Sequence, residues 1–324
     1  MKTRLLLLKT LADSRFHSGE KLGQQLGISR TAVWKHIQVL QQLGIDCYSV
    51  SGKGYRLAKP IELLEQQSIL GAMHDAGRKL VSQIELHPEI PSTNRYLMDH
   101  LGASMISGHA CLVERQTAGR GRRGRSWVSP FARNIYLSYY WRFDISPEGL
   151  SGLGLAIGVG VIRALKQLGV ESAKLKWPND ILWQGRKLAG ILLEMSGEMA
   201  GPYHVVVGVG LNVNMSDGDA EIDQPWVDLN EIKGEIVSRN RVAGLLLSEL
   251  MQVTSEFQQH GLPPFMEEWA AADAFAGQAV LIHMADQQIP GEARGIDASG
   301  AILVETEAGL RRFHSGEVSL RPWS

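Results

Sequence analysis

A run of glycine and arginine interrupts an apolar part of the chain and limits what this part can fold into. Residues 115–125 contain five arginines, and glycines stand at positions 119, 121 and 124. Glycine lets the backbone approach a ligand closely, and arginine binds phosphate or carboxylate oxygens in pairs. The run therefore predicts neither a buried helix nor a strand, but a loop that is ordered when it closes over an anion.

The same loop also matches a dinucleotide-binding pattern. Gly119 to Gly124 fits GxGxxG, and Asp144 follows at a suitable distance. In dinucleotide-binding folds the glycine loop opens a helix, whereas Pro130 and the strand-like stretch 135–143 follow here. We interpret the GxGxxG match as a coincidence. A second nucleic-acid patch or a solvated loop remain alternatives, but the apolar, acidic surroundings favour a nucleotide pocket.

The composition is that of a folded chain with two or three domains. Its 324 residues are 44% hydrophobic and 21% charged, which supports sizeable cores. The most apolar run, Leu155–Ile162, stops at Arg163, well short of the roughly 20 residues that cross a bilayer, so no membrane is expected. Cys47 and Cys111 lie far apart without a CxxC pattern, which indicates a cytoplasmic protein without disulfides.

Charge is distributed unevenly along the chain. Residues 1–60 carry ten lysines and arginines against three acidic residues, a net charge of +7, and the rest of the chain carries −8. A basic N-terminal module on an acidic body indicates a polyanionic partner for this module alone.

The basic module has the pattern of a helix-turn-helix. Ser18 is a plausible N-cap for a helix ending near Leu26, Gly27 supplies the turn, and Ser29 caps a longer helix that stops at Gly44. The strand-like segments 45–50 and 55–57 then form a hairpin that resembles a wing. The candidate DNA contacts are Ser29, Arg30, Thr31, Lys35, Lys53 and Arg56. A small helical protein-interaction module is the alternative, and Trp34 is expected to be a packing residue.

The central part of the chain predicts a buried helix and a pocket at strand ends. The segment 153–168 is apolar nearly all round. Asn179, Asp180, Lys187 and Asn212 fall at or beside strand ends, where one sheet could bring them together. Short strands between 279 and 314 predict a small β-barrel or sandwich at the C-terminus. Hydrolase, P-loop and zinc-enzyme motifs are missing from the sequence.

Taken together, the motifs resemble those of biotin–protein ligases, specifically the bifunctional kind that is also the biotin operon repressor. The resemblance spans the whole chain and rests on the segments 29–36, 52–55, 92–94, 119–127, 176–180, 187–191 and 208–212. It implies a multidomain α/β (α+β) fold: an N-terminal winged helix-turn-helix, a central mixed sheet with helices akin to class II synthetases, and a C-terminal SH3-like β-barrel. The expected division is 1–60 for the DNA-binding domain, 61–84 for a helical connector, 85–274 for the catalytic domain and 275–324 for the C-terminal domain.

The resemblance implies that biotin reacts with Mg-ATP to give biotinyl-5'-AMP, and that a lysine of a biotin carboxyl carrier protein then takes the biotin. The implied catalytic residues are Lys187 and Arg122. The implied biotin contacts are Ser92, Thr93, Asn94, Gln116, Arg120, Gly121, Arg122 and Lys187. The implied ATP and adenylate contacts are Gly119, Arg123, Arg125, Trp127, Asn179, Asp180 and Asn212, with Asp180 also a candidate magnesium ligand. Pro91 stands where the family commonly has an acidic residue, which weakens the assignment of Ser92.

The N-terminal module implies a second role. The adenylate would order the arginine loop and favour a homodimer, which would bind a two-fold operator of biotin biosynthesis genes. A ligand-sensing repressor without catalysis and a lipoate-type ligase of the same fold remain the alternatives.

Overall fold

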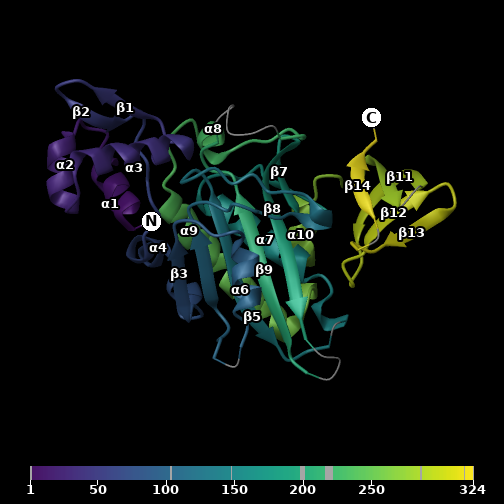
Figure 1. Ribbon diagram of the computed structural model, residues 1–324. Helices are drawn as coiled ribbons and strands as arrows, with labels where there is room; N and C mark the ends of the chain where they lie inside the picture. The colour runs from purple at the N-terminus through teal and green to yellow at the C-terminus, as the bar shows by residue number, and fades with distance from the viewer. Residues whose placement is uncertain are drawn as a thin grey trace.

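The computed structural model describes residues 2–102, 104–146, 148–197, 201–215, 222–284, 287–316 and 318–323. Three bodies follow one another along the chain (Figure 1). The helical N-terminal module and the small C-terminal β-domain lie at opposite ends of a central domain built on a large sheet. The order of these bodies confirms the predicted architecture.

The N-terminal module consists of α1 (Lys2–Leu11), α2 (Gly19–Leu26), α3 (Arg30–Gln42) and the hairpin of β1 (Cys47–Val50) and β2 (Gly54–Leu57). Both predicted caps are confirmed, because Ser18 Oγ accepts from Lys21 N and Ser29 Oγ accepts from Ala32 N, each at 3.1 Å. Gly27 turns the chain between the helices at φ 65°, a conformation that favours glycine. Buried Leu22, Val33 and Ile37 lie in its apolar core.

Trp34 is not a packing residue. Its neighbours Val33 and Ile37 face the core, whereas Trp34 is 49% exposed. The expectation of packing was wrong because an aromatic residue at an outward helical position has no core side to reach.

The helical connector joins the module to the central domain through α4 (Gln66–Ala72) and α5 (Asp75–Arg78). Both short helices pack on α9 (Arg239–His260). A buried ion pair between Arg239 Nη1 and Glu114 Oε2, 2.8 Å long, lies at this junction. Glu114 Oε1 also accepts from the backbone N of Leu64 at 2.6 Å, which fixes the start of the connector.

In the described residues the central sheet has seven strands in the order β3-β4-β5-β9-β8-β7-β6. The strands are β3 (Gln83–His87), β4 (His109–Val113), β5 (Ile135–Phe143), β6 (Lys174–Lys176), β7 (Asp180–Trp183), β8 (Arg186–Ser196) and β9 (Tyr203–Leu211). β3 and β4 run parallel and the other neighbours antiparallel, so the sheet is mixed.

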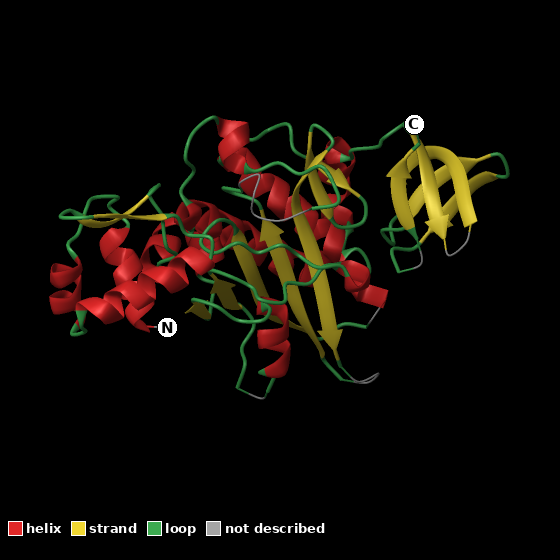
Figure 2. Ribbon diagram, turned by 45° about the horizontal axis from the view of Figure 1, so that its top comes forward, coloured by secondary structure: helices red, strands yellow, loops and turns green. Residues whose placement is uncertain are grey.

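Helices cover both faces of this sheet (Figure 2). The helix α6 (Thr93–Asp99) packs against β4, β5 and β9, and the remaining helices of the domain are α7 (Leu153–Gln167), α8 (Leu229–Lys233), α9 and α10 (Met266–Ala272). Short 3-10 helices lie at Arg122–Gly124, Glu148–Leu150 and Pro263–Phe265. Among the described residues one stretch, Glu148–Gln167, is apolar and long enough to cross a membrane, but 67% of it is buried inside the molecule, as in a core helix.

The C-terminal domain is an antiparallel sheet ordered β13-β12-β11-β10-β14. Its strands are β10 (Ala279–Met284), β11 (Gln287–Ile296), β12 (Ile302–Thr306), β13 (Gly309–Phe313) and β14 (Ser319–Pro322), of which β14 was not predicted. Among the hydrogen bonds that tie this domain to the central one are those from Trp177 Nε1 to Gly300 O (3.1 Å) and from Ser151 Oγ to Ser299 O (2.5 Å).

Candidate functional site

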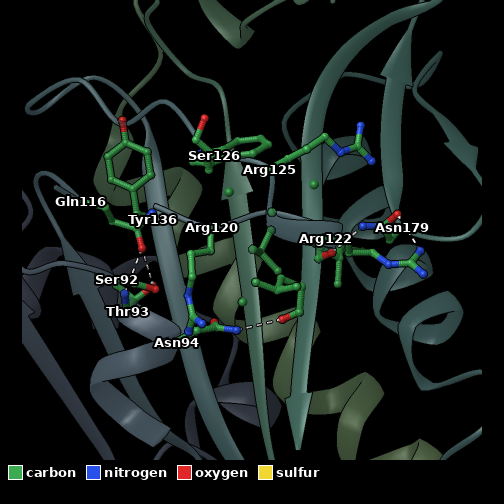
Figure 3. A pocket seen from close by; sticks show the side chains of 18 of the residues that line it. Ser92, Thr93, Asn94, Gln116, Arg120, Arg122, Arg125, Ser126, Tyr136 and Asn179 are labelled. Atoms are coloured by element: carbon green, nitrogen blue, oxygen red, sulfur yellow. Dashed lines mark hydrogen bonds between the residues drawn. The ribbon is translucent and has the colours of Figure 1, made fainter. Parts of the chain in front are cut away.

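A cavity of about 80 Å³ opens between the start of α6, the arginine loop and the ends of β7 to β9 (Figure 3). These segments are far apart in the sequence and meet because β5, β9 and β8 are neighbours in the sheet. The predicted site residues that line the cavity are Ser92, Thr93, Asn94, Gln116, Arg120, Gly121, Arg122, Arg125, Trp127, Asn179, Asp180 and Lys187.

The floor of the cavity is made of glycine. Gly190 on β8 and Gly210 on β9 are register partners, and the indole of Trp127 lies over both. A Cβ on Gly210 would lie 2.4 Å from Trp127 Cε2, and a Cβ on Gly190 would lie 3.0 Å from Cζ3. Glycine at these positions therefore makes room for a flat ring system at the level of the sheet.

A buried polar network occupies the end of the cavity near α6. Ser138 Oγ, on β5, lies 2.6 Å from both Thr93 Oγ1 and Asn94 Oδ1. Gln116 Oε1 accepts from Thr93 N at 2.9 Å. Such a network is fully connected, so it fixes the direction of each donor and acceptor toward a polar ligand.

Ser92 contributes to this end of the cavity in a different way. Its side chain is buried and caps α6, accepting from Arg95 N at 3.4 Å. Ser92 thus sets where the helix begins and how Thr93 and Asn94 face the cavity.

Glu194 on β8 joins two of the predicted biotin contacts. Arg120 Nη2 lies 3.0 Å from its carboxylate, and Asn94 Nδ2 donates to the same group at 2.9 Å. Glu194 therefore holds Arg120 and Asn94 close together, and Figure 3 shows the Arg120 side chain extending toward Asn94.

Lys187 forms the most buried ion pair of the site. Its Nζ lies 2.8 Å from Asp180 Oδ1, and both side chains are about 14% exposed or less. The same ammonium lies 5.4 Å from the centre of the Trp127 ring, a cation–π distance. A buried cation between an aromatic face and a single carboxylate can attract a second anion, such as a phosphate or carboxylate of a ligand.

Arg122 spans the central and C-terminal domains. It donates to Asn179 Oδ1 at 3.3 Å and also to the carbonyl of Ser315. Burial lowers the pKa of Arg122, and the nearby positive charges of Arg123 and Arg125 lower it further, whereas Asp180 raises it. A half-buried guanidinium crowded by like charges favours an anion at its side.

A second, basic cavity of about 300 Å³ adjoins the first. Arg125 and Asn179 line both cavities, and Lys176 and Arg321 line only the second. Burial lowers the pKa of the Lys176 ammonium. The positive lining of the second cavity suits an oligophosphate.

Three predicted residues do not line the main cavity. Gly119 packs against its own loop, where a Cβ would meet Trp127 O at 2.4 Å. Arg123 lines the basic cavity instead and donates to Gly316 O at 3.5 Å. Asn212 lies in an adjoining cavity, and its amide donates to Lys187 O and Val227 O, so it supports the segment that carries Lys187.

Sequence reasoning missed Ser138, Glu194, Lys176 and Arg321 as lining or supporting residues. The motifs include the glycines at 190, 208 and 210, but the sequence did not predict that they line the cavity. Lys176 lies in the segment 176–180 on which the resemblance rests, so its charge was a usable signal. Ser138 stands in an apolar strand, and only the sheet register reveals that it faces α6.

The predicted DNA contacts gather on two elements. Arg30, Thr31 and Lys35 are exposed on α3, and Ser29 is exposed but uses its hydroxyl as the cap. In the wing, the Arg56 guanidinium lies 5.0 Å from the Phe16 ring centre and 5.6 Å from that of Tyr48. Lys53 Nζ lies 5.9 Å from the same Phe16 ring, so aromatic side chains orient the two cations of the wing.

Sequence comparison decides the family. The chain is 43% identical to the bifunctional ligase/repressor BirA of Escherichia coli strain K12, over 98% of this chain and 97% of that protein. It belongs to the bifunctional ligase/repressor family of biotin–protein ligases. The chain is also 31% identical to the BirA protein of Bacillus subtilis strain 168, over 99% of this chain and 98% of that protein.

Family models match the three bodies separately. The biotin/lipoate A/B protein ligase family covers residues 86–212, an HTH domain covers 3–56, and the biotin protein ligase C-terminal domain covers 275–321. Among solved structures, the biotin protein ligase of Aquifex aeolicus in complex with biotin and ATP aligns with a TM-score of 0.65 and 29% identity. It covers 75% of this chain and 100% of that one.

Proposed function

We propose that this member of the bifunctional ligase/repressor family makes biotinyl-5'-AMP from biotin and ATP and transfers biotin to a lysine of a carrier protein. The observation that carries the proposal is the buried Lys187–Asp180 pair beside Trp127 in a cavity walled by arginines. The relatives named as ligase/repressor support the activity, and so does the homologous structure that holds biotin and ATP.

In the first step an oxygen of the biotin carboxylate attacks the α-phosphorus of ATP. A carboxyl–phosphate bond forms, the bond between the α- and β-phosphates breaks, and pyrophosphate leaves. Both reactants are anions, so charge neutralisation and alignment supply most of the catalysis. Lys187 lies between the proposed biotin and nucleotide ends and serves both anions.

The biotin end of the cavity is the polar network around α6. We assign the head group to Ser92, Thr93, Asn94, Gln116 and Arg120, because these residues present donors and acceptors at the closed end of the cavity. Gly121, Arg122 and Lys187 lie at the carboxylate end. Glu194 pairs with Arg120 and holds its guanidinium at the same end as Asn94.

The nucleotide end is assigned to Trp127, Asn179 and Asp180 for the adenylate and to Arg123 and Arg125 for the β- and γ-phosphates. Gly119 and Asn212 support this end through the loop backbone and the Lys187 segment.

Asp180 and Asn179 offer oxygens that suit Mg²⁺. Within the described residues no three His, Cys, Asp or Glu side chains gather around a metal position. Two protein oxygens are sufficient when ATP phosphates complete the coordination, as is usual for Mg²⁺. The ion would neutralise phosphate charge during the first step.

In the second step the carrier's lysine amine attacks the anhydride carbonyl, an amide forms and AMP leaves. A direct test incubates the chain with biotin, Mg-ATP and the biotin-accepting domain of an acetyl-CoA carboxylase, with equimolar lipoic acid as competitor. The proposal predicts a mass increase on the carrier from biotin alone. Modification by lipoic acid would favour the lipoate-type alternative.

The repressor role assigns Ser29, Arg30, Thr31, Lys35, Lys53 and Arg56 to operator DNA, with phosphate contacts for the basic ones. We also propose an adenylate-bound homodimer. The pairing of β8 with β7 ends at Gly190, and β8 continues beyond this point with one edge not paired to β7. Exposed Met195 lies on this part of β8. This edge suits symmetric strand pairing between two copies of the chain. A ligand-sensing repressor without catalysis would bind biotin and release no pyrophosphate.

The proposed domain limits are 1–60, 61–84, 85–274 and 275–324. The two cysteines are buried and free, which supports a cytoplasmic location.

A further inference from the structure

The outward face of α3 carries a large aromatic side chain at its centre. Trp34 is 49% exposed, and Arg30 and Gln38 lie one helical turn before and after it on the same exposed face. Exposed Thr31 and Lys35 flank it. A tryptophan in this position contributes nothing to the apolar core of the module, which includes Val33, Ile37 and Leu40.

The surroundings of Trp34 select a polyanion rather than a protein partner. The first turn of α3 holds no acidic residue, and residues 1–60 carry a net charge of +7. The wing adds Lys53 and Arg56, each oriented against an aromatic ring. An exposed apolar residue with Arg30 and Lys35 beside it on the same helix suits a partner surface that has a small apolar group next to phosphates.

We propose that Trp34 reads a base: its indole packs against the 5-methyl group of a thymine in the major groove. The inference rests on the operator binding proposed above. In the major groove the thymine methyl is the one apolar group that a base pair presents, whereas the other groups are hydrogen-bond donors and acceptors. An indole offers a wide apolar face and a single donor, so it distinguishes A·T from G·C pairs through this methyl group.

The proposal separates two kinds of contact on the module. Lys35, Lys53 and Arg56 hold the phosphates and supply affinity that does not depend on sequence. Trp34 supplies sequence preference at one position of each half-site. Removal of a phosphate-binding cation and removal of the Trp34 indole therefore have different signatures.

The experiment first identifies the preferred sites. The full chain, incubated with biotin and Mg-ATP, selects duplexes from a random-sequence DNA pool, and the same selection is run with Trp34→Ala. Lys53→Ala serves as the phosphate-binding comparison. Leu6→Ala removes an apolar side chain that is 47% exposed on α1, outside the recognition helix, and is the matched control.

The decisive step uses a synthetic site from the wild-type selection in which the preferred thymine of each half-site is replaced by deoxyuridine. This change removes one methyl group from each half-site and nothing else. Burial of one such group corresponds to about a fourfold change in affinity, so the wild-type chain should bind about 15-fold more weakly for two half-sites. Trp34→Ala should bind the thymine and uracil sites equally, and Leu6→Ala should behave as the wild type.

Each remaining result counts for or against the inference. One outcome is that the wild type selects a two-fold site while deoxyuridine weakens the binding of Trp34→Ala as much as that of the wild type. In that case Trp34 does not read the methyl group and the inference is wrong, but the repressor role stands. If Trp34→Ala abolishes the cooperative unfolding of the module, the indole has a structural role, and that also overturns the inference. If the wild type selects no sequence with or without biotin and ATP, the proposed repressor function itself fails.

Discussion

Gly210 lies beneath the indole of Trp127, where any side chain would collide with the ring. The position of Trp127 at the proposed nucleotide end of the site therefore requires a residue without a Cβ at position 210. Polar pairs at single residues also shape the cavity: Lys187 pairs with Asp180, and Glu194 binds both Arg120 and Asn94.

Gly210→Ala should weaken ATP binding without unfolding the protein. The added methyl would lie 2.4 Å from Trp127 Cε2, so the indole must move away from the sheet. Overpacking of this size costs about 1–3 kcal/mol, which predicts a KM for ATP raised about 10-fold in the adenylation assay. Gly71→Ala, whose Cβ meets nothing within 4 Å, is the control and should leave the KM unchanged. An unaltered KM for Gly210→Ala would separate Trp127 from nucleotide binding.

At the scale of elements, a carboxylate on the edge strand β3 helps to anchor α6 to the sheet. Glu85 on β3 accepts hydrogen bonds from Tyr96 Oη at 2.7 Å, His109 Nε2 at 2.6 Å and His87 Nε2 at 3.1 Å. Burial alone would raise the pKa of Glu85, but these hydrogen bonds together outweigh burial and lower it. The hydrogen bond to Glu85, followed by burial, raises the pKa of Tyr96 to about 12.

The stability that Glu85 contributes should therefore disappear in acid. Because the pKa is lower in the folded than in the unfolded state, the contribution is present above the usual pKa near 4.5 and is lost as the pH falls through the lowered folded value. Glu85→Gln should lower the free energy of unfolding by about 1–2 kcal/mol at pH 7 and much less once the pH has fallen below the lowered folded pKa. Urea unfolding at a series of pH values measures the difference. An equal decrease at every pH would contradict the role of the charge.

The segment after the arginine loop joins the N-terminal module to the catalytic domain. Phe131 and Ala132 are buried in the same apolar cluster as the core of the module, together with partly buried Ile61 and Leu63 of the connector. Ala132 N also donates to Glu114 O at 2.9 Å, next to the buried Arg239 pair. The loop that is proposed to close over the adenylate is therefore continuous with a segment packed into the DNA-binding module.

Phe131→Ala should loosen the module while adenylation continues. The cavity left by a buried phenylalanine costs about 3–5 kcal/mol. Hydrogen exchange of residues 3–57 should accelerate, and Phe131→Leu should restore most of the protection. Unchanged exchange in Phe131→Ala would show that the module is stable without this side chain.

At the scale of the whole molecule, the basic module and the cavity of the candidate site belong to different domains. The basic module stands at one end and the acidic body holds the cavity, with the C-terminal domain joined to it through Arg122, Trp177 and Ser151. The proposed DNA affinity should then depend on salt through the module alone. Lys53→Ala should reduce the slope of log affinity against log salt by about 1 for each phosphate that is no longer neutralised, or about 2 for a dimer. An unchanged slope in a filter-binding titration would remove Lys53 from the interface.

Much of this architecture could be predicted because local rules decide it. Ser18, Gly27 and Ser29 specify the helix ends by capping and turn geometry, and the run around Gly119 to Arg125 excludes regular buried structure. Ser138 and Glu194 could not be predicted, since their roles arise from strand register between segments distant in sequence. Trp34 was misjudged because residue type favours burial whereas helical phase decides exposure. The fold of β14 onto β10 likewise depends on a long-range pairing.

Adenylate formation tests the central claim most directly. The purified chain is incubated with biotin and Mg-ATP, and biotinyl-5'-AMP and pyrophosphate are measured by mass spectrometry and a coupled assay. We expect both products from the wild type, a rate lowered about 100-fold or more in Lys187→Ala, and little change in the neighbouring control Arg186→Ala, whose side chain pairs with Glu231 instead. Biotin binding without adenylate, or a Lys187→Ala variant as fast as the wild type, would contradict the account.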